Sequence, residues 1–565
     1  MIRFIPLIAF LSLYIAGLSQ VAPDKYFIEF TDKNHSPYSL DRPQEFLSWR
    51  AMDRRASYAI PIDSTDLPVT PAYVDSVSQV GVTVITRCKW FNGITVFTSD
   101  PGLISIIENF HFVKRVIKNS LLFVPSNTPT KFLVEYADRF PVRYHHPISF
   151  KCSDSSEYGL SFTQVHMVNA DYLHDQGYRG EGIEIAVLDA GFLNANIIPA
   201  LDSLRTHNQI LGTQDFVEPG GNVYTGHPHG TEVLSIMGGN LPGQLIGTAP
   251  KAAYWLLRSE DASSEYLIEE YNWISAAEFA DSAGTDVINS SLGYRVFDDS
   301  TQNHTCTDMN GHTTPVTRGA NIAFSKGILV VNSAGNEGGN TSWPCVSAPS
   351  DGDDVIGVGA VDSLRQYASF SSTGVVNGSY VKPNIAAMGR LTVLASPDGT
   401  IMRSNGTSFS SPIIAGSIAC LWQARKSYSN SLLKAATEAS GSQFTHPDKY
   451  LGFGIPDFKK ALESLDIPEK SKNFWDVIVF PNPFASSDPL NITVNSPSPM
   501  NIRLELFNMM GIKIVQDENI QCRPGISTIP VTFPTGLEDG LYLIVISNPG
   551  NEITRKLIKV QRLTR

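Results

Sequence analysis

A serine near the start of an unusually apolar run is the first candidate for chemistry in this sequence. Ser408 lies in the stretch NGTSFSSP (405–412), and the run that follows, 413–422, is apolar or small throughout. A helix without a polar stripe is a buried helix. We expect its first turn to tolerate Pro412, because early helical N–H groups lack intrahelical partners. The helix N-terminus favours negative charge, so Ser408 could act as a nucleophile there, although such a serine often only caps the helix.

An aspartate at the end of a predicted strand and a histidine just before a predicted helix are the next candidates for chemistry. Asp189 closes an apolar predicted strand, 183–188. Ligand sites in parallel sheets lie beyond the carboxyl ends of strands, and a carboxylate is costly to bury there, although an Asp at a strand end often only forms a turn or caps a helix. His229 lies in HPHGTEV (227–233), just before a predicted helix, Thr231–Met237. His227 and His229 could bind a metal, but no acidic or cysteine partner stands beside them at metal spacing, so we expect none.

An asparagine follows another predicted strand. Asn336 lies in SAGNEG (333–338), directly after Ile328–Val331. Asparagine after a strand normally just forms a turn. Glu337 could favour basic groups at a specificity pocket, or could be a solvated turn residue. Taken singly, each of these side chains has an ordinary structural explanation, so the elements that hold them matter.

The middle of the chain, 158–466, alternates short apolar strands with helices. This pattern predicts an α/β domain with a parallel sheet and helices on both faces. Such a sheet would gather Asp189, Asn336 and the residues near His229 at one site. The predicted strands are 183–188, 253–257, 286–289, 328–331 and 355–358, and the predicted helices are 231–237, 266–280 and 316–325.

Two further domains flank this one. Residues 20–119 read as strand–helix–strand–strand–helix–strand, which predicts a ferredoxin-like α+β unit. Residues 120–157 have few regular signals and could hold a processing site. Residues 474–565 repeat short strands with turn signals, which predicts a small β-sandwich.

The composition and the N-terminal sequence limit which cell compartment and which kinds of partner this protein can have. The formal net charge of −12 argues against nucleic acid or anionic membrane as a partner. Residues 1–19 read as a signal peptide, with an apolar run too short to span a membrane, and we expect no transmembrane segment elsewhere. Export permits disulfides. Cys306 and Cys345, both in polar, turn-rich segments, are the best candidates for a pair, whereas Cys420 should be a core residue, and no Cys-x-x-Cys spacing suggests zinc.

Taken together, the motifs resemble those of the subtilisin-like serine peptidases, the subtilases. The three motifs AVLDAG (186–191), HGT (229–231) and GTSFSSP (406–412) stand in the family's chain order Asp, His, Ser. The segment SAGN (333–336) resembles the family's oxyanion segment, and SSLG (290–293) its substrate-binding strand. IGTAP (246–250) and KPNI (382–385) are similar to further landmarks. The resemblance implies a subtilisin-like fold and a serine endopeptidase.

The resemblance also implies roles for single residues. Asp189, His229 and Ser408 would be catalytic, with Asn336 in the oxyanion hole. The implied substrate-binding residues are Ser291, Leu292, Gly293, Ala334 and Gly335. No cofactor is needed for the chemistry; structural calcium is possible, but no Asp-rich loop marks a site. Two positions depart from the family pattern, Glu232 where a second His is frequent and Ala190 where Thr or Ser is frequent, and neither removes a catalytic group.

The flanking domains resemble parts of exported family members. Residues 20–119 resemble the inhibitory propeptide, with a permanent accessory domain as the alternative. Residues 474–565 resemble a type IX secretion sorting domain through FPNPF (480–484), LFNMMG (506–511), GLY (540–542) and KLIKV (556–560); a carbohydrate- or protein-binding sandwich is the alternative.

The resemblance as a whole implies a zymogen, secreted or attached to the outer surface of a Gram-negative bacterium. Its partners would be peptide or protein substrates, its own propeptide and the type IX machinery. A catalytically dead adhesin and an esterase are the competing functions.

Overall fold

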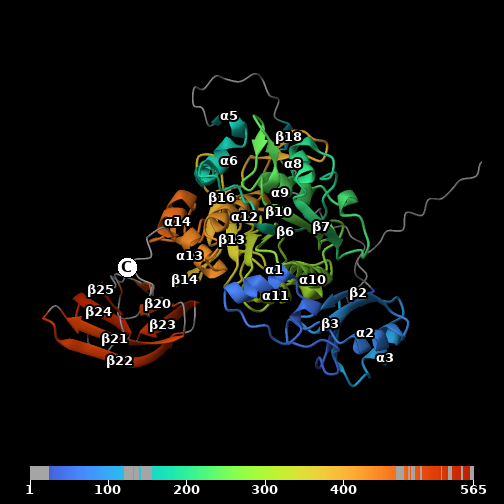
Figure 1. The fold of residues 1–565 in the computed structure, drawn as a ribbon, viewed down its shortest axis with the longest axis horizontal. Coiled ribbons are helices and arrows are strands. Elements are labelled where there is room, and N and C mark those ends of the chain that lie inside the picture. The colour runs from blue at the N-terminus through green and yellow to red at the C-terminus, as the bar shows by residue number, and fades with distance from the viewer. Residues whose placement is uncertain are drawn as a thin grey trace, which may run out of the picture.

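The structure is a computed structural model that describes three folded regions of the chain (Figure 1). The predicted signal peptide and most of 120–157 lie outside the described residues. The described residues are 24–119, 132, 139–141, 155–378, 380–465, 476–480, 484, 490–496, 499–508, 510–522, 525–531, 537–548 and 551–559.

The middle domain is built on a seven-stranded sheet with the order β16-β13-β12-β11-β6-β10-β7. Every neighbouring pair is parallel. The five predicted strands are all present, whereas the edge strands β7 and β16 were not predicted. The strands are β6 (Glu184–Asp189), β7 (Ile210–Asp215), β10 (Ala253–Arg258), β11 (Val287–Ser290), β12 (Leu329–Ser333), β13 (Ile356–Val361) and β16 (Ile385–Met388).

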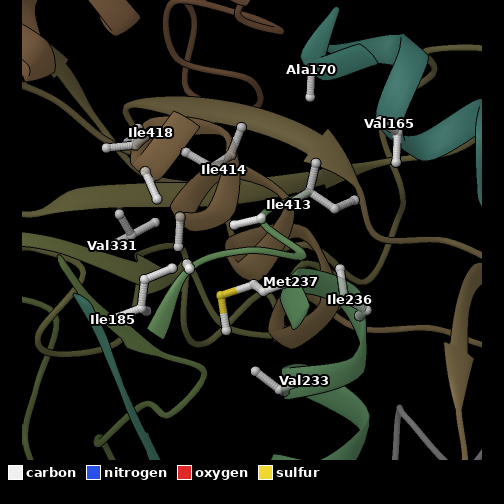
Figure 2. Packing of buried hydrophobic residues seen from close by; sticks show 14 of the residues in the cluster. Val165, Ala170, Ile185, Val233, Ile236, Met237, Val331, Ile413, Ile414 and Ile418 are labelled. Atoms are coloured by element: carbon white, nitrogen blue, oxygen red, sulfur yellow. The ribbon is translucent and has the colours of Figure 1, made fainter. Parts of the chain in front are cut away.

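Helices cover both faces of this sheet, as predicted. Along β6, Ile185 and Val187 belong to one hydrophobic core with helices α9 and α12, while Ala186 and Leu188 belong to a second core with α10 and α11. This alternation follows from the two-residue period of a strand. Figure 2 shows Ile413 of α12 packed near Met237 of α9 in the first core. The helices are α9 (His229–Gly238), α10 (Ile268–Ala283), α11 (Pro315–Ser325) and α12 (Thr407–Ala424).

Pro412 does not lie in the first turn of its helix, so that prediction is wrong. Helix α12 begins at Thr407 and contains Pro412 in its interior. Proline has no N–H to donate to the carbonyl four residues earlier, which is that of Ser408. The Ser291 hydroxyl donates to this carbonyl instead, at 2.8 Å. A side chain from outside the helix therefore replaces the missing donor.

The N-terminal domain has the predicted ferredoxin-like order. Its antiparallel strands lie in the order β2-β3-β1-β4, with two helices inserted between strands as expected. A further helix, α1, lies against α10 of the middle domain (Figure 1). The elements are β1 (Lys25–Phe30), α1 (Trp49–Ser57), α2 (Pro71–Ser78), β2 (Thr83–Cys88), β3 (Gly93–Phe97), α3 (Pro101–Ile107) and β4 (Val113–Lys118).

The C-terminal domain is rich in β-structure, as predicted. Two sheets, of order β19-β20-β23 and β22-β21-β24-β25, share one hydrophobic core. The strands are β19 (Asp476–Phe480), β20 (Leu490–Ser496), β21 (Met500–Asn508), β22 (Lys513–Cys522), β23 (Gly525–Val531), β24 (Gly540–Asn548) and β25 (Asn551–Lys559).

A small three-stranded sheet, β17-β18-β5, lies beside the main one and leads into the Ser408 turn. It consists of β5 (Phe140–Pro141), β17 (Thr392–Ala395) and β18 (Ile401–Ser404). The remaining elements are η1 (Pro43–Glu45), α5 (Ser155–Tyr158), α6 (Phe162–Met167), α7 (Ala170–Asp175), η2 (Pro199–Leu201), α8 (Asp202–Thr206), η3 (Val223–Thr225), β8 (Asn240–Leu241), β9 (Leu245–Ile246), η4 (Ser300–Gln302), β14 (Val376–Asn377), β15 (Tyr380–Val381), α13 (Asn430–Ala439) and α14 (Phe458–Leu465).

The cysteines follow the sequence-based expectations. Cys306 and Cys345 form a disulfide, which confirms the predicted pair. Cys420 is fully buried within α12, as expected for a core residue. Among the residues that the structure describes, no helix is both long and apolar enough to cross a membrane.

Candidate active site

Asp189 and His229 are brought together by the main sheet and helix α9. Asp189 is the last residue of β6 and His229 the first of α9, and both side chains are buried. The His229 Nδ1 and Asp189 Oδ1 atoms lie 2.8 Å apart, within hydrogen-bond distance. A carboxylate on Nδ1 holds the imidazole in the tautomer that exposes Nε2 for proton transfer.

A glycine allows these two elements to approach. The backbone N–H of Gly230 donates to the carbonyl of Gly191 at 3.0 Å. A Cβ atom at Gly230 would lie 2.4 Å from that carbonyl oxygen and 2.9 Å from the Cβ of Asp189. Any larger residue would therefore push the start of α9 away from the end of β6.

Ser408 enters the same site from the N-terminus of α12. It is the second residue of the helix and is 4% exposed. The ring of its neighbour Phe409 lies 5.8 Å from the ring of His229, which places the first turn of α12 beside the first turn of α9. Gly406 precedes the helix at φ 151°, a conformation that L-residues rarely adopt.

Asn336 is held beside Ser408 by Thr407. The Asn336 Oδ1 atom accepts two hydrogen bonds from Thr407, from its backbone N–H and from its hydroxyl, both at 2.9 Å. The same hydroxyl accepts from the N–H of Gly335 at 3.2 Å. These bonds turn the oxygen end of the amide toward Thr407. The sequence motifs did not point to Thr407 as the residue that orients Asn336.

The predicted substrate-binding residues follow two neighbouring strands. Ser291, Leu292 and Gly293 follow β11, and Ala334 and Gly335 follow β12. Because β11 and β12 are parallel neighbours, both segments leave the same edge of the sheet as Asp189. The Asn332 side chain also donates to the carbonyl of Leu292 at 3.0 Å, which ties the two segments together. Their role toward a substrate stays a prediction.

Glu337 is paired with an arginine of the chain itself. It is half-buried and forms an ion pair with Arg295 at 2.6 Å. It is therefore less exposed than a solvated turn residue, and its role toward basic substrate groups stays a prediction.

Two contacts from the segment after the N-terminal domain were not anticipated. The buried ring of Phe132 stacks on His227 and His229 at centroid distances of 4.6 and 4.3 Å. Arg139 forms an ion pair with Glu232, which is 1% exposed. The sequence did mark Glu232 as a departure from the family pattern, but nothing local marks Phe132 or Arg139 as partners of α9.

One group of carboxylates in the described residues has the spacing of a cation site. Atoms of Glu260, Glu265 and Glu269 lie within 4.8 Å of one another, and oxygen ligands of this type suit calcium. Glu260 already accepts from the Tyr294 hydroxyl at 2.7 Å, and Glu269 from the N–H of Tyr266 at 3.1 Å. Such a cluster does not by itself assign an ion.

Comparison with known proteins decides the family. The model of the subtilase family matches residues 180–454. Subtilisin of Bacillus pumilus is 31% identical over 318 residues, which is 55% of this chain and all of the relative. The chain belongs to the subtilase family. Subtilisin E of Bacillus subtilis is 30% identical over 319 residues, 56% of this chain and 74% of the relative.

The flanking domains of this subtilase match models as well. Residues 25–131 match the peptidase S8 propeptide domain of Bacteroidota, and residues 478–560 match a secretion system C-terminal sorting domain. The solved structure of the prenylagaramide maturation protease PagA covers 52% of this chain and 98% of its own, with 23% identity and a TM-score of 0.41. The three family models and the similarity to subtilisins show a subtilase-family serine peptidase with a propeptide domain and a sorting domain, as the sequence motifs predicted.

Proposed function

We propose that this subtilase is an exported serine endopeptidase, made as a zymogen, that cleaves peptide bonds through an acyl-enzyme. The observation that carries the proposal is the buried hydrogen bond between His229 Nδ1 and Asp189 Oδ1, 2.8 Å long, with Ser408 on the helix beside it. A serine hydroxyl is a weak nucleophile unless a base is positioned to take its proton.

In the first half of the reaction, Ser408 Oγ bonds to the scissile carbonyl carbon while His229 Nε2 takes the hydroxyl proton. The imidazolium is stabilised by Asp189. His229 then gives the proton to the leaving amine as the C–N bond breaks, which leaves an acyl-enzyme. In the second half, water attacks the acyl carbon, His229 takes the proton of that water, and the proton returns to Ser408 as the acid product leaves.

The oxyanion of the tetrahedral intermediate would be held by Asn336 and by the start of α12. Because Asn336 Oδ1 is occupied by Thr407, the amide nitrogen is the end of that side chain that would donate to the oxyanion. The backbone N–H of Ser408 and the N-terminal end of the helix would add further positive potential. Such preorganised donors act where charge develops during the reaction.

An extended substrate would lie between two segments at the edge of the sheet. Residues 291–293 and 334–335 follow neighbouring parallel strands, so a peptide running between them would bring its scissile bond to Ser408. This arrangement favours peptides over small esters as substrates.

The propeptide would inhibit the enzyme before it is cut away. Its docking surface is α10, where Glu278 accepts the backbone N–H groups of Lys89 and Trp90 at 2.7 and 2.8 Å, and where Arg54 pairs with Asp281 at 2.6 Å. Phe132, which follows the propeptide domain in the chain, covers His229, because its ring stacks on the imidazole. A covered imidazole cannot serve a substrate.

The sorting domain supports export through the type IX machinery, to the medium or to the outer surface of a Gram-negative cell. Residues 478–560 match the model of such a domain.

A fluorophosphonate probe, which labels an activated serine, tests the enzyme proposal. The matured protein should be labelled, and the Ser408→Ala variant should not. The full-length zymogen should react more slowly than the matured protein. Absence of label on the matured wild-type protein would favour the dead adhesin, and hydrolysis of esters without any peptide in a library would favour the esterase.

A further inference from the structure

A short stretch beyond the propeptide, residues 139–141, is held on the catalytic domain at two places. Arg139 forms an ion pair with Glu232 of α9. Phe140 and Pro141 form strand β5, which pairs with β18 in antiparallel register, Phe140 opposite Arg403. The match to the propeptide model ends at residue 131, before this stretch. We call residues 139–141 the strap.

The strap contacts the two elements that present the catalytic side chains. Glu232 lies three residues after His229, on the same face of α9. Strand β18 ends at Ser404 and leads directly into the turn before Ser408. The sheet that the strap extends is itself bonded to α9, because the N–H of Ala395 donates to Ser235 Oγ at 2.9 Å. The strap therefore spans from the helix of the base to the strand that leads to the nucleophile.

Removal of Arg139 would be costly for the catalytic domain. The Glu232 side chain is 1% exposed and that of Arg139 is 16% exposed. With the strap in place all ten residues of α9 are buried, so replacing Arg139 within the bound strap would leave Glu232 as a charge among packed side chains. Breaking a buried ion pair by removing one partner is strongly destabilising, because the remaining charge is neither solvated nor neutralised.

We propose that the strap stays on the catalytic domain after the propeptide leaves, and that Arg139 is a positioning residue that acts on His229 through Glu232. This proposal rests on the proposed function. It requires that the maturation cut lies on the N-terminal side of Arg139. The strap would then be the start of the working enzyme rather than the end of its inhibitor.

The charge balance around His229 gives Arg139 a role beyond stability. Among the described residues, Asp189 at the end of β6 is hydrogen-bonded to His229, His227 lies beside it in the preceding turn, and the pair of Glu232 and Arg139 lies one turn along α9. While both members of the pair are charged, their effects on His229 largely cancel. Loss of either one leaves a single charge near the imidazole.

The position of the maturation cut is tested first. N-terminal sequencing and intact mass of the self-processed full-length protein should give a mature chain that contains Arg139. An N-terminus after Arg139 would overturn the proposal. Fluorophosphonate labelling of the same sample separates the two proposals: if Ser408 is unlabelled and no cut appears, it is the proposed function that fails.

The pH dependence of kcat/KM of the matured enzyme tests the role of Arg139. In Arg139→Gln the remaining carboxylate stabilises the imidazolium, so the acid limb should move up by about 0.5–1 pH unit. In Glu232→Gln the remaining guanidinium should move it down by a similar amount. The double variant should return close to the wild-type profile, and Arg139→Lys should stay near it. Two single variants that lose activity without opposite displacements of the limb would overturn the positioning role.

Two further readouts complete the test. Glu232→Gln could raise KM only for peptides with a basic residue. This result would show that Glu232 of the mature enzyme pairs with the substrate and not with Arg139, and it would overturn the proposal. Thermal unfolding of the full-length Ser408→Ala chain needs no activity: each single variant should lower Tm, and the double variant should lower it by less than the sum. Strictly additive losses would show that the ion pair is not coupled and would contradict the proposal.

Discussion

The Ser291 hydroxyl donates to the backbone carbonyl of Ser408 at 2.8 Å, at the position where Pro412 leaves that carbonyl without its helical partner. The Ser408 hydroxyl in turn donates to the carbonyl of Ser291 at 3.3 Å. Each of these two serines therefore donates a side-chain hydrogen bond to the backbone carbonyl of the other. The first turn of α12 is stabilised in this way by a residue that lies directly after β11.

This relationship predicts the effect of Ser291→Ala. The variant leaves a buried carbonyl without its donor, which should lower the free energy of unfolding by about 1–3 kcal/mol. Pro412→Ala restores a backbone N–H at the right place, so Ser291→Ala should cost little in that background. Urea unfolding of the four combinations, all carrying Ser408→Ala to prevent autolysis, measures the coupling. Equal losses in both backgrounds would contradict this account of the helix.

Asp189→Asn should lower kcat by roughly 10⁴, because an amide can hold His229 in the wrong tautomer and cannot stabilise the imidazolium. KM should change little, since the Asp189 side chain is fully buried. Steady-state kinetics on a peptide substrate measure both parameters.

Activity of the parent enzyme should also fall as pH drops through the ordinary range of histidine, about 6.5, and a profile without an acid limb would argue against His229 as the base.

Asn336→Ala should lower kcat by roughly 10²–10³, the usual cost of losing an oxyanion donor, for which subtilisin is the reference case. Thr407→Val provides the matched control, because it removes the hydroxyl that holds Asn336 Oδ1 but keeps the amide. Its loss of kcat should be smaller, on the order of tenfold. A kcat of Asn336→Ala equal to that of the parent would remove Asn336 from the mechanism.

Release of the cut propeptide should depend on pH through Glu278. Burial raises the pKa of Glu278 to about 7, although the nearby Lys89 ammonium and the bonds from Cys88, Trp90 and Lys89 oppose this rise. If the carboxyl returns to its ordinary pKa when the propeptide leaves, docking takes up a proton between about pH 4.5 and 7. Affinity is then highest below the ordinary pKa and is lost as pH rises through 7.

The processed but undissociated complex should therefore release propeptide at least tenfold more readily at pH 8 than at pH 5. Size-exclusion chromatography of the cut complex at the two pH values measures the release. In Glu278→Gln the dependence should flatten, since the amide does not titrate. An unchanged pH dependence in this variant would assign the effect to another group.

His174 should make the catalytic domain sensitive to acid. Burial lowers the pKa of His174 to about 4, and its ring nitrogens lie 2.8 Å from the Tyr158 hydroxyl and 3.0 Å from the carbonyl of Thr248. In the unfolded chain His174 has the ordinary histidine pKa of about 6.5, so between about pH 4 and 6.5 the unfolded chain binds a proton that the folded domain does not bind. Stability is therefore full above about pH 6.5 and falls as the pH drops toward 4, by about 3 kcal/mol.

Urea unfolding of the full-length Ser408→Ala chain at pH 7.5 and 4.5 tests this, with His174→Gln as the matched variant. The glutamine variant should lose less stability on acidification than its parent. Equal acid losses in the two chains would show that groups other than His174 govern the transition.

Much of the site was predictable because its signals are local. Short motifs contain Asp189, His229 and Ser408 together with the glycines beside them, and their order along the chain can be read directly. Apolar runs of strand length predict a parallel sheet. Because ligand sites in such sheets lie at the carboxyl ends of strands, these motifs had to meet there. The disulfide between Cys306 and Cys345 followed in the same way, from two cysteines in turn-rich segments.

Other features were decided only by tertiary packing. Whether Pro412 lies in the first turn of α12 depends on where the helix starts, and the helix starts at Thr407. The donor that serves the Ser408 carbonyl comes from Ser291, and the partner of Glu232 is Arg139; neither lies near its partner in the sequence. Local propensity sets which elements form and which side chains are available. A buried carbonyl or carboxylate accepts whichever donor the packed chain brings within reach, and that choice exists only once the domain has folded.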